Sequence, residues 1–349
     1  MVNSSGIRRT AAATYVLDQC EQLELAVRWA GGGANTVRLV GPAGEAILVR
    51  TDGRGLGIVE QLLRQLRFDF AALPLLVCGE SKEVRLLTPR VTIAKLLPTV
   101  YSFTHQRYGE APGTDAVRAR FCAALFREMA RAPGAYHLAN AFLGLVESPH
   151  GPLLVEHRVM PGNVEVRVKR YHIGSPVHRY RYVSQHPTAR GGAPLGRWQR
   201  FDTPLVCFDW RHPMTDEDGR ALADEPLPDD YAALWIDDIA GKRLARDTFG
   251  WIEQLFARKG LRLIDICFFI DAAGRAIFGE ISPDCMRVRS DAADGSDALD
   301  KDEWRSGGDA ATVLRRYRRL ATIVFGDNAL SDDALSHDAP CEQVLNEAA

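Results

Sequence analysis

The chain has 349 residues, of which 46% are hydrophobic and 25% are charged, and its formal net charge is −2. This balance is typical of a globular protein with an ample core and gives no general attraction to nucleic acid or to an anionic membrane. No apolar run approaches the roughly eighteen residues that a membrane span requires, and residues 1–9 lack the apolar core of a secretion signal.

The beginning of the chain predicts a small antiparallel sheet. Apolar and polar residues alternate from Leu23 to Val49, and glycine-rich turns at 31–33 and 41–44 separate the runs. Helical spacing follows at 58–66, and strand character returns at 75–78 and 83–87. We therefore expect an N-terminal sheet lobe over residues 1–98. The glycines at 31–33 have no Gly-Lys-Ser/Thr after them, so they predict a hairpin turn and exclude a phosphate-binding loop.

The middle of the chain predicts a helical segment followed by strands. Alanine, leucine, phenylalanine and methionine recur at spacings of three and four over 115–145, with a break at Pro133-Gly134. We interpret residues 99–150 as a helical insertion. Strands are expected at 152–157 and 164–170, and loops at 184–200 and 212–230.

The last part predicts a second, larger lobe over residues 151–330. A long amphipathic helix is expected from 234 to 259, with a possible interruption at Gly241 and with Gly260 at its end. A hairpin of strands 261–270 and 275–281 follows it, then a final helix at 311–325. Residues 331–349 form an acidic tail. The predicted fold class is α+β, with two lobes of mainly antiparallel sheets and flanking helices.

The seven cysteines are scattered and form no Cys-x-x-Cys pair, and the nine histidines are equally dispersed. This distribution favours reduced, mostly buried thiols in a cytoplasmic protein, without a zinc site or a disulfide framework. Cys267 lies in an apolar strand without a neighbouring base, which favours a packed thiol over a nucleophile.

The most informative feature is a pair of charged segments after the predicted hairpin. The sequence from Phe278 to Asp284 reads Phe-Gly-Glu-Ile-Ser-Pro-Asp, and the sequence from Asp300 to Arg305 reads Asp-Lys-Asp-Glu-Trp-Arg. Carboxylates and cations at the mouth of a buried sheet suit a polar, phosphorylated ligand. The pair therefore indicates a binding site.

Four segments in order resemble the SAICAR synthetase (phosphoribosylaminoimidazole-succinocarboxamide synthase) family. That family has a strand with "VExVVRxxxxGS", then "GLxLVDFKLEFG", "DEISPD" and "DKDxxR". The matching segments here begin at Val164, Gly260, Gly279 and Asp300. The resemblance implies the two-lobed fold of that family. It also implies the family's reaction, in which ATP phosphorylates the carboxylate of an aminoimidazole ribotide and the amine of aspartate displaces the phosphate.

On the ribotide side of the implied site, most of the family's chemistry is retained. The resemblance assigns substrate binding to Lys169, Gly174, Ser175, Arg179, Arg287, Lys301 and Arg305. Lys169 replaces an arginine of the family, which keeps the charge and loses the bidentate fork. Glu280, Asp284 and Asp300 are the candidate catalytic acids or bases. The basic and aromatic residues over 167–182 fit the rim of a phosphate pocket better than a nucleic-acid surface, because the chain is nearly neutral and has no RNA-binding motif.

On the nucleotide side, the charges of the family are missing. The family's Gly-Lys-x-Lys start aligns best with Gly32-Gly33-Ala34-Asn35, which has no lysine. The lysine and glutamate of "DFKLEF" fall on Cys267 and Phe269, and the first acid of "DEISPD" falls on Gly279. In the family, the glutamate of "DFKLEF" and the first acid of "DEISPD" hold Mg²⁺. Because Phe269 and Gly279 take their places, we expect no metal site here.

The leading hypothesis is a repurposed enzyme of this family. It acts on an aminoimidazole or purine-like ribonucleotide in the biosynthesis of a purine-analogue nucleoside of the pentostatin or coformycin type, opening or closing a ring without the ancestral use of ATP and Mg²⁺. One alternative is a ligase that joins aspartate to a carboxyaminoimidazole ribotide, the only reading that requires ATP and Mg²⁺ as cofactors. A second is a non-catalytic nucleotide-binding protein. The expected partner is a small-molecule ribonucleotide, without nucleic acid or membrane, and a homo-oligomer is left open.

Overall fold

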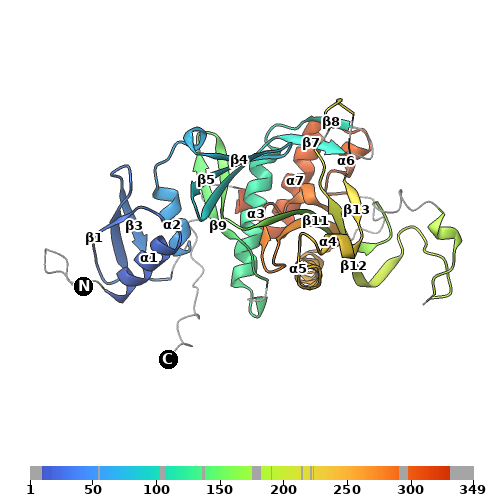
Figure 1. Ribbon diagram of the computed structural model, residues 1–349, viewed down its shortest axis with the longest axis horizontal. Helices are drawn as coiled ribbons and strands as arrows, with labels where there is room; N and C mark the ends of the chain where they lie inside the picture. Colours follow the sequence, from blue (N-terminus) through green and yellow to red (C-terminus); the bar gives the residue numbers. More distant parts are fainter. Residues whose placement is uncertain are drawn as a thin grey trace.

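The computed structural model describes residues 10–53, 56–102, 107–135, 138–174, 182–189, 191–213, 215–220, 222, 224–290 and 298–330. The molecule is elongated, with the N-terminal elements at one end and the larger C-terminal sheet with its helices at the other (Figure 1). Strands within each sheet pair antiparallel, so the predicted two-lobed α+β fold is confirmed. No helix in the described ranges is both long and apolar enough to cross a membrane.

The predicted N-terminal meander is present. It consists of β1 (Arg28–Gly32), β2 (Thr36–Val40) and β3 (Ala46–Arg50), with helices α1 (Ala11–Gln22) and α2 (Ile58–Gln65) beside it. In β3, Ile47 and Val49 are buried while the intervening residues are exposed, as the alternation in the sequence requires.

A second sheet joins the N-terminal elements to the rest of the chain. Its strand order is β4-β5-β6-β10-β9, formed by β4 (Leu75–Cys78), β5 (Lys82–Thr88), β6 (Val91–Leu96), β9 (Phe142–Ser148) and β10 (Gly151–His157). A short 3-10 turn, η1 (Phe70–Ala72), precedes β4. Apolar side chains of β6, β9 and β10 share a core with the N-terminal meander. The first lobe is therefore continuous with this sheet.

Residues 99–150 contain strands as well as a helix. The hairpin of β7 (Thr99–Ser102) and β8 (Arg107–Glu110) comes first, and α3 (Thr114–Arg131) follows. The expectation of helix up to residue 145 is wrong, because the helix ends before Pro133 and residues 142–148 pair with β10 as β9.

The C-terminal lobe is built on a six-stranded sheet in the order β13-β12-β11-β14-β15, with β16 also on β14. Its strands are β11 (Pro161–Tyr171), β12 (Arg200–Trp210), β13 (Glu225–Leu227), β14 (Leu261–Asp271), β15 (Ile277–Phe278) and β16 (Met286–Ser290). Helix α5 (Asp238–Ala257) packs on one face of β11 and β14. It begins at Asp238, after the cap Asp237 and four residues later than expected, and Gly241 does not interrupt it.

The remaining elements are short, apart from the last helix. They are η3 (Val183–Gln185), α4 (Asp229–Ala232), η4 (Pro283–Cys285), α6 (Asp302–Arg305), α7 (Ala310–Phe325) and η5 (Asp327–Leu330). The predicted loop at 212–230 contains β13 and the start of α4, while the predicted final helix is α7. The acidic tail predicted at 331–349 lies outside the described residues.

The two central strands of this sheet position the site. In β11 and β14, alternate residues such as Val166 and Phe268 are buried in the core with α5. The residues between them, Glu165, Arg167, Asp265, Cys267 and Phe269, face the opposite side and line a cavity. The strand alternation therefore turns one face toward the core and the other toward the cavity.

Candidate functional site

The cavity lies between the C-terminal sheet, the start of β5, the end of β7 and the loop that carries α6. Five of the residues predicted for the site line it: Glu280, Asp284, Arg287, Lys301 and Arg305. Gly174 is adjacent, because a methyl group added to it would lie 2.6 Å from Nη1 of Arg287. Ser175 and Arg179 fall outside the described residues. Lys169 and Asp300 are described and do not line the cavity.

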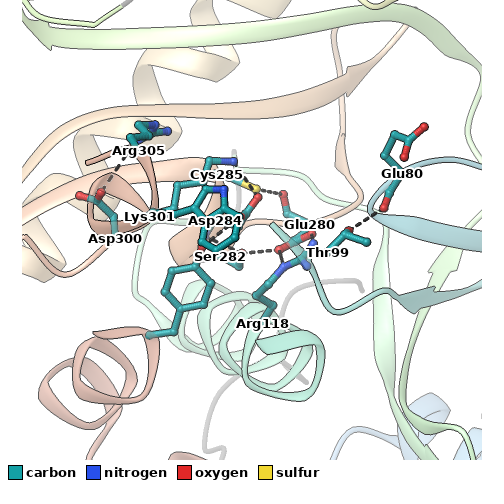
Figure 2. A network of polar contacts seen from close by, with 12 residues as sticks. Glu80, Thr99, Arg118, Glu280, Ser282, Asp284, Cys285, Asp300, Lys301 and Arg305 are labelled. Carbon is teal, nitrogen blue, oxygen red and sulfur yellow. Dashed lines mark hydrogen bonds and ion pairs between the residues drawn. The ribbon is translucent and has the colours of Figure 1, made fainter. Parts of the chain in front are cut away.

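Glu280 is held in a buried ion pair. Arg118 of α3 is 0% exposed and donates from Nε and Nη2 to the two carboxylate oxygens, each at 2.7 Å. The hydroxyl of Ser282 donates to the same carboxylate. Figure 2 shows the two side chains meeting from α3 and from the segment after β15. Because both oxygens are engaged, Glu280 fixes the cavity wall to α3.

Asp284 lies at the centre of a second buried contact. Lys301 donates to its Oδ2 at 2.9 Å, and the hydroxyl of Tyr317 donates to its Oδ1 at 2.7 Å. Burial alone would raise the pKa of this carboxyl, but Lys301 and then Arg118 outweigh burial and lower the pKa to about 2. Asp284 is therefore ionised throughout the physiological range.

Lys169 does not line the cavity but contacts Asp265, a residue that does. Its ammonium is 1% exposed and donates to Asp265 at 2.7 Å, while Arg287 donates to the same oxygen at 2.6 Å. Burial opposes ionisation of Asp265, yet Arg287 and Lys169 hold its pKa well below the ordinary value. Lys169 was predicted to bind substrate; in the structure it does not line the cavity, and its contact orients Asp265 and Arg287.

Asp300 also has a supporting position. It is 0% exposed and accepts from the amides of Val288 and Asp302, at 2.8 and 2.7 Å, and from Arg289 at 2.6 Å. These bonds tie β16 to α6. Asp300 thus lies outside the cavity, whereas Glu280 and Asp284, the other two candidate catalytic residues, line it.

The ion pairs at this end of the cavity leave a surplus of positive charge. Four carboxylates, Asp265, Asp284, Asp300 and Asp302, meet five cations among the described residues: Lys169, Arg287, Arg289, Lys301 and Arg305. Arg287, Lys301 and Arg305 also line the cavity. We refer to these three as the cation wall. A partly buried surplus cation is an attractive position for a phosphate group.

Several lining residues were missed by sequence reasoning. They are Ser81, Lys82, Tyr101, Ser102, Glu165, Arg211 and Asp224, while Arg167 lies at the cavity as the predicted pocket rim over 167–182 implied. The period of two along β11 placed Glu165 and Arg167 on the same face as Lys169, and this signal was available. Arg211 and Asp224 had no such signal. Arg211 follows β12, for which no strand was predicted, and Asp224 precedes β13, which lies in the predicted loop at 212–230.

The segment predicted to correspond to the start of the family's nucleotide half lies away from the cavity. Gly32-Gly33-Ala34-Asn35 form the β1–β2 turn and do not line the cavity. Lys82 does line it, with Nζ 5.0 Å from the ring centre of Phe269 and 3.0 Å from the position of a β-carbon on Gly279. Gly79-Glu80-Ser81-Lys82 matches Gly-Lys-x-Lys at its first and last positions. Lys82 therefore supplies a cation to this part of the cavity.

The residues present do not fit a Mg²⁺ ion. The family's two metal ligands correspond to Phe269 and Gly279, which offer no side-chain oxygen. The nearby carboxylates Glu280 and Asp284 have their oxygens engaged by Arg118, Lys301 and Tyr317. Within the described ranges, no group of three or more histidine, cysteine, aspartate or glutamate residues is arranged to hold a metal ion.

The sequence model of the SAICAR synthetase family matches residues 87–319. Similar solved structures include a SAICAR synthetase in complex with ADP (TM-score 0.57, 18% identity, 72% of this chain and 97% of that one). They also include the enzyme of Ehrlichia chaffeensis (TM-score 0.56, 15% identity, 72% of this chain and 98% of that one). A third is the Saccharomyces cerevisiae enzyme complexed with SAICAR (TM-score 0.54, 15% identity, 74% of this chain and 97% of that one). At these identities, the likeness shows the fold alone.

A curated relative is the bifunctional cordycepin biosynthesis cluster protein 3 of Cordyceps militaris. It is 27% identical over 290 residues, which cover 70% of this chain. The chain spans only 32% of that relative's length. The match therefore concerns one part of a longer protein.

Proposed function

The chain belongs to the SAICAR synthetase family, and from this membership we propose that it is an enzyme acting on an aminoimidazole or purine-like ribonucleotide in the biosynthesis of a purine-analogue nucleoside. The relative named for a cordycepin biosynthesis cluster supports the nucleoside part of the proposal. A pathway of the pentostatin or coformycin type, with ring opening or closure as the reaction, is the specific form that we favour.

The observation that carries the proposal is the cation wall with its surplus positive charge. Arg287 and Arg305 each keep about a fifth of the side chain exposed while they are held by Asp265 and Asp302. Their guanidinium groups are thus oriented before a ligand arrives, which lowers the entropy lost on binding. Gly174 presents its backbone directly beside Arg287, where a side chain would block the approach of a phosphate.

The nucleotide half supports a departure from the ancestral reaction. Phe269 and Gly279 replace charged residues of the family, and the remaining carboxylates are neutralised by Arg118 and Lys301. We therefore propose that the enzyme works without ATP and Mg²⁺. Asp284 stays ionised beside the cavity and is proposed to accept hydrogen bonds from ribose hydroxyls or the amine of the ring, while Glu280 and Asp300 position the wall.

One observation favours the alternative of an ATP-dependent ligase. Lys82 lies at the cavity beside Phe269, and we propose that it takes the place of the second lysine of the family's nucleotide motif. Under this alternative, Lys82 would bind a nucleotide phosphate. Mg²⁺ would then depend on ligands supplied by the substrates.

Isothermal calorimetry with 5-aminoimidazole-4-carboxamide ribonucleotide tests the proposal. We expect saturable binding without ATP or Mg²⁺, and about 10- to 100-fold weaker binding for Arg287→Ala, since a charge-assisted hydrogen bond contributes roughly 1.5–3 kcal/mol. Asp265 retains Lys169 in this variant, so the fold is expected to survive. The matched control is Arg275→Ala, at an exposed arginine in the β14–β15 turn. Unchanged affinity in Arg287→Ala would show that the phosphate binds elsewhere.

A further inference from the structure

Two of the three residues of the cation wall belong to a segment that is too short to be stable alone. Arg305 is the last residue of α6, which has four residues, and Lys301 is the cap directly before it. An isolated helix of this length does not form in water, because its first turn fixes several residues for very few hydrogen bonds. The position of Arg305 therefore depends on the contacts that hold α6 in place.

The start of α6 is held by β16. Asp302, the first residue of α6, accepts a hydrogen bond from Arg289 of β16. Asp300 accepts from the amide of Val288 at 2.8 Å and from Arg289 at 2.6 Å. Figure 2 shows Asp300 beside Arg305, and their side chains are 3.7 Å apart. These contacts fix the start of the helix and leave its end to another element.

The end of α6 is held by Arg107 of β8. Its Nη1 donates to the carbonyl of Trp304 at 2.5 Å, and its Nη2 donates to the carbonyl of Gly308 at 2.8 Å. The last carbonyl groups of a helix lack partners within the helix, and an arginine near the C-terminal end can donate to them. Arg107 therefore closes the C-terminal end of α6.

The same two residues are also in contact through their side chains. The guanidinium of Arg107 lies 3.8 Å from the ring centre of Trp304, and the indole nitrogen donates to the carbonyl of Arg107 at 3.4 Å. Trp304 is 7% exposed and packs in a small core with Val100 and Tyr317. A cation over an aromatic ring is held more firmly where water is excluded. The contact thus joins β8 to α6 in both directions.

Gly109 allows β8 to come this close to the indole. It lies two residues after Arg107, on the same face of the strand. A β-carbon at this position would lie 2.7 Å from Cη2 of Trp304, which is too close for any residue but glycine. Two positions of β8 are therefore fitted to one side chain of α6.

This contact connects two segments that line the cavity. Arg107 pairs with Ser102 of β7, and Ser102 and Tyr101 both line the cavity. On the other side, Nζ of Lys301 lies 5.0 Å from the ring centre of Tyr101. Strand β7 contacts α6, and the two lie side by side in Figure 1. Arg107 itself does not line the cavity, so any effect that it has on a ligand is indirect.

We propose that Arg107 is a positioning residue for the phosphate of the bound ribonucleotide. It acts through α6, by holding Arg305 of the cation wall where its guanidinium meets the phosphate. The proposal rests on the proposed function, which assigns the phosphate to the cation wall. Arg287 lies on β16 and is held by Asp265, so loss of Arg107 should displace Arg305 and leave Arg287 in place.

Amide hydrogen exchange of the protein without ligand tests the first step. The amides of residues 305–308 donate to the carbonyls of residues 301–304. In Arg107→Ala they should exchange at least about tenfold faster, while the amides of α5 keep their protection. Gly109→Ala displaces Trp304 without removing the guanidinium, so it gives the same reading if Arg107→Ala does not fold. The control Tyr108→Ala removes a side chain that is 52% exposed from the same strand, and protection should persist. Unchanged exchange at 305–308 in Arg107→Ala would overturn the proposal.

Calorimetry with 5-aminoimidazole-4-carboxamide ribonucleotide tests the second step. Arg107→Ala should bind about tenfold more weakly than wild type, because one charge-assisted contact to the phosphate is impaired. In an Arg305→Ala background, the same change should cause no further loss, since the group through which Arg107 acts is gone. An equal loss in both backgrounds would show a purely structural role and overturn the proposal. If the wild type does not bind the ribonucleotide, the proposed function fails, and the exchange measurement still decides whether Arg107 holds α6.

Discussion

Replacing Glu280 by glutamine is expected to destabilise the protein by about 3–5 kcal/mol. Glutamine keeps the shape of the side chain and removes its charge. Arg118 is 0% exposed, and its Nε and Nη2 both donate to Glu280 at 2.7 Å. A guanidinium cannot shed its proton in a protein, so the variant leaves a buried charge without its main partner. Breaking a buried ion pair in this way costs roughly 3–5 kcal/mol.

Urea unfolding followed by tryptophan fluorescence measures this loss. The matched control is Glu147→Gln, which breaks the more exposed pair with Arg120 of the same helix and should cost less than about 1 kcal/mol. A double variant, Arg118→Leu with Glu280→Leu, removes both charges and should recover much of the stability. If Glu280→Gln unfolds at the urea concentration of the wild type, the ion pair does not support the cavity wall. That result would favour the predicted catalytic role for Glu280.

Three further outcomes are expected. Asp284→Asn should lower the free energy of unfolding by about 2 kcal/mol at pH 7. Because the folded pKa of about 2 lies below the unfolded value, the difference from wild type in urea titrations should disappear as the pH falls from about 4 through 2. Asp224→Asn should instead gain about 3 kcal/mol at pH 8, since the raised folded pKa of about 6 means that ionisation destabilises the wild type as the pH rises from about 4 through 6; equal stability at pH 8 would contradict the shift. Gly174→Ala should weaken binding of the ribonucleotide at least about tenfold, because the backbone has φ +68° and the new methyl meets Arg287 at 2.6 Å; unchanged calorimetric affinity would place the ligand elsewhere.

The order of the elements could be predicted where local pattern and tertiary pairing agree. The alternation around Val49 and in 164–170, and the helical spacing that ends at Gly260, all became the expected strands and helices. Strand β12 was missed because Pro204 interrupts its pattern. In the structure, this proline falls where the ladder with β11 is irregular between Leu205 and Arg200, which is a position that tolerates the absence of an amide donor.

The composition of the cavity could be predicted only in part. Motif order placed Asp284 and the cation wall at one site, since these residues are close in the sequence. It could not show that Lys169 is captured by Asp265, or that Arg118 reaches Glu280 across 162 residues of chain, because both depend on the packing of separate elements. Asp224 had no sequence signal, since its chemistry arises from Glu165 and Arg211 on other strands.

The central claim is that the cavity binds a ribonucleotide through its phosphate and no longer binds ATP with Mg²⁺. The most direct measurement is a pair of calorimetric titrations of the wild-type protein, one with 5-aminoimidazole-4-carboxamide ribonucleotide alone and one with ATP and Mg²⁺. We predict saturable binding of the ribonucleotide, at least about tenfold weaker binding of the corresponding nucleoside without phosphate, and no saturable binding of ATP. Binding of ATP–Mg²⁺ with near-micromolar affinity would contradict the account and favour the ATP-dependent ligase.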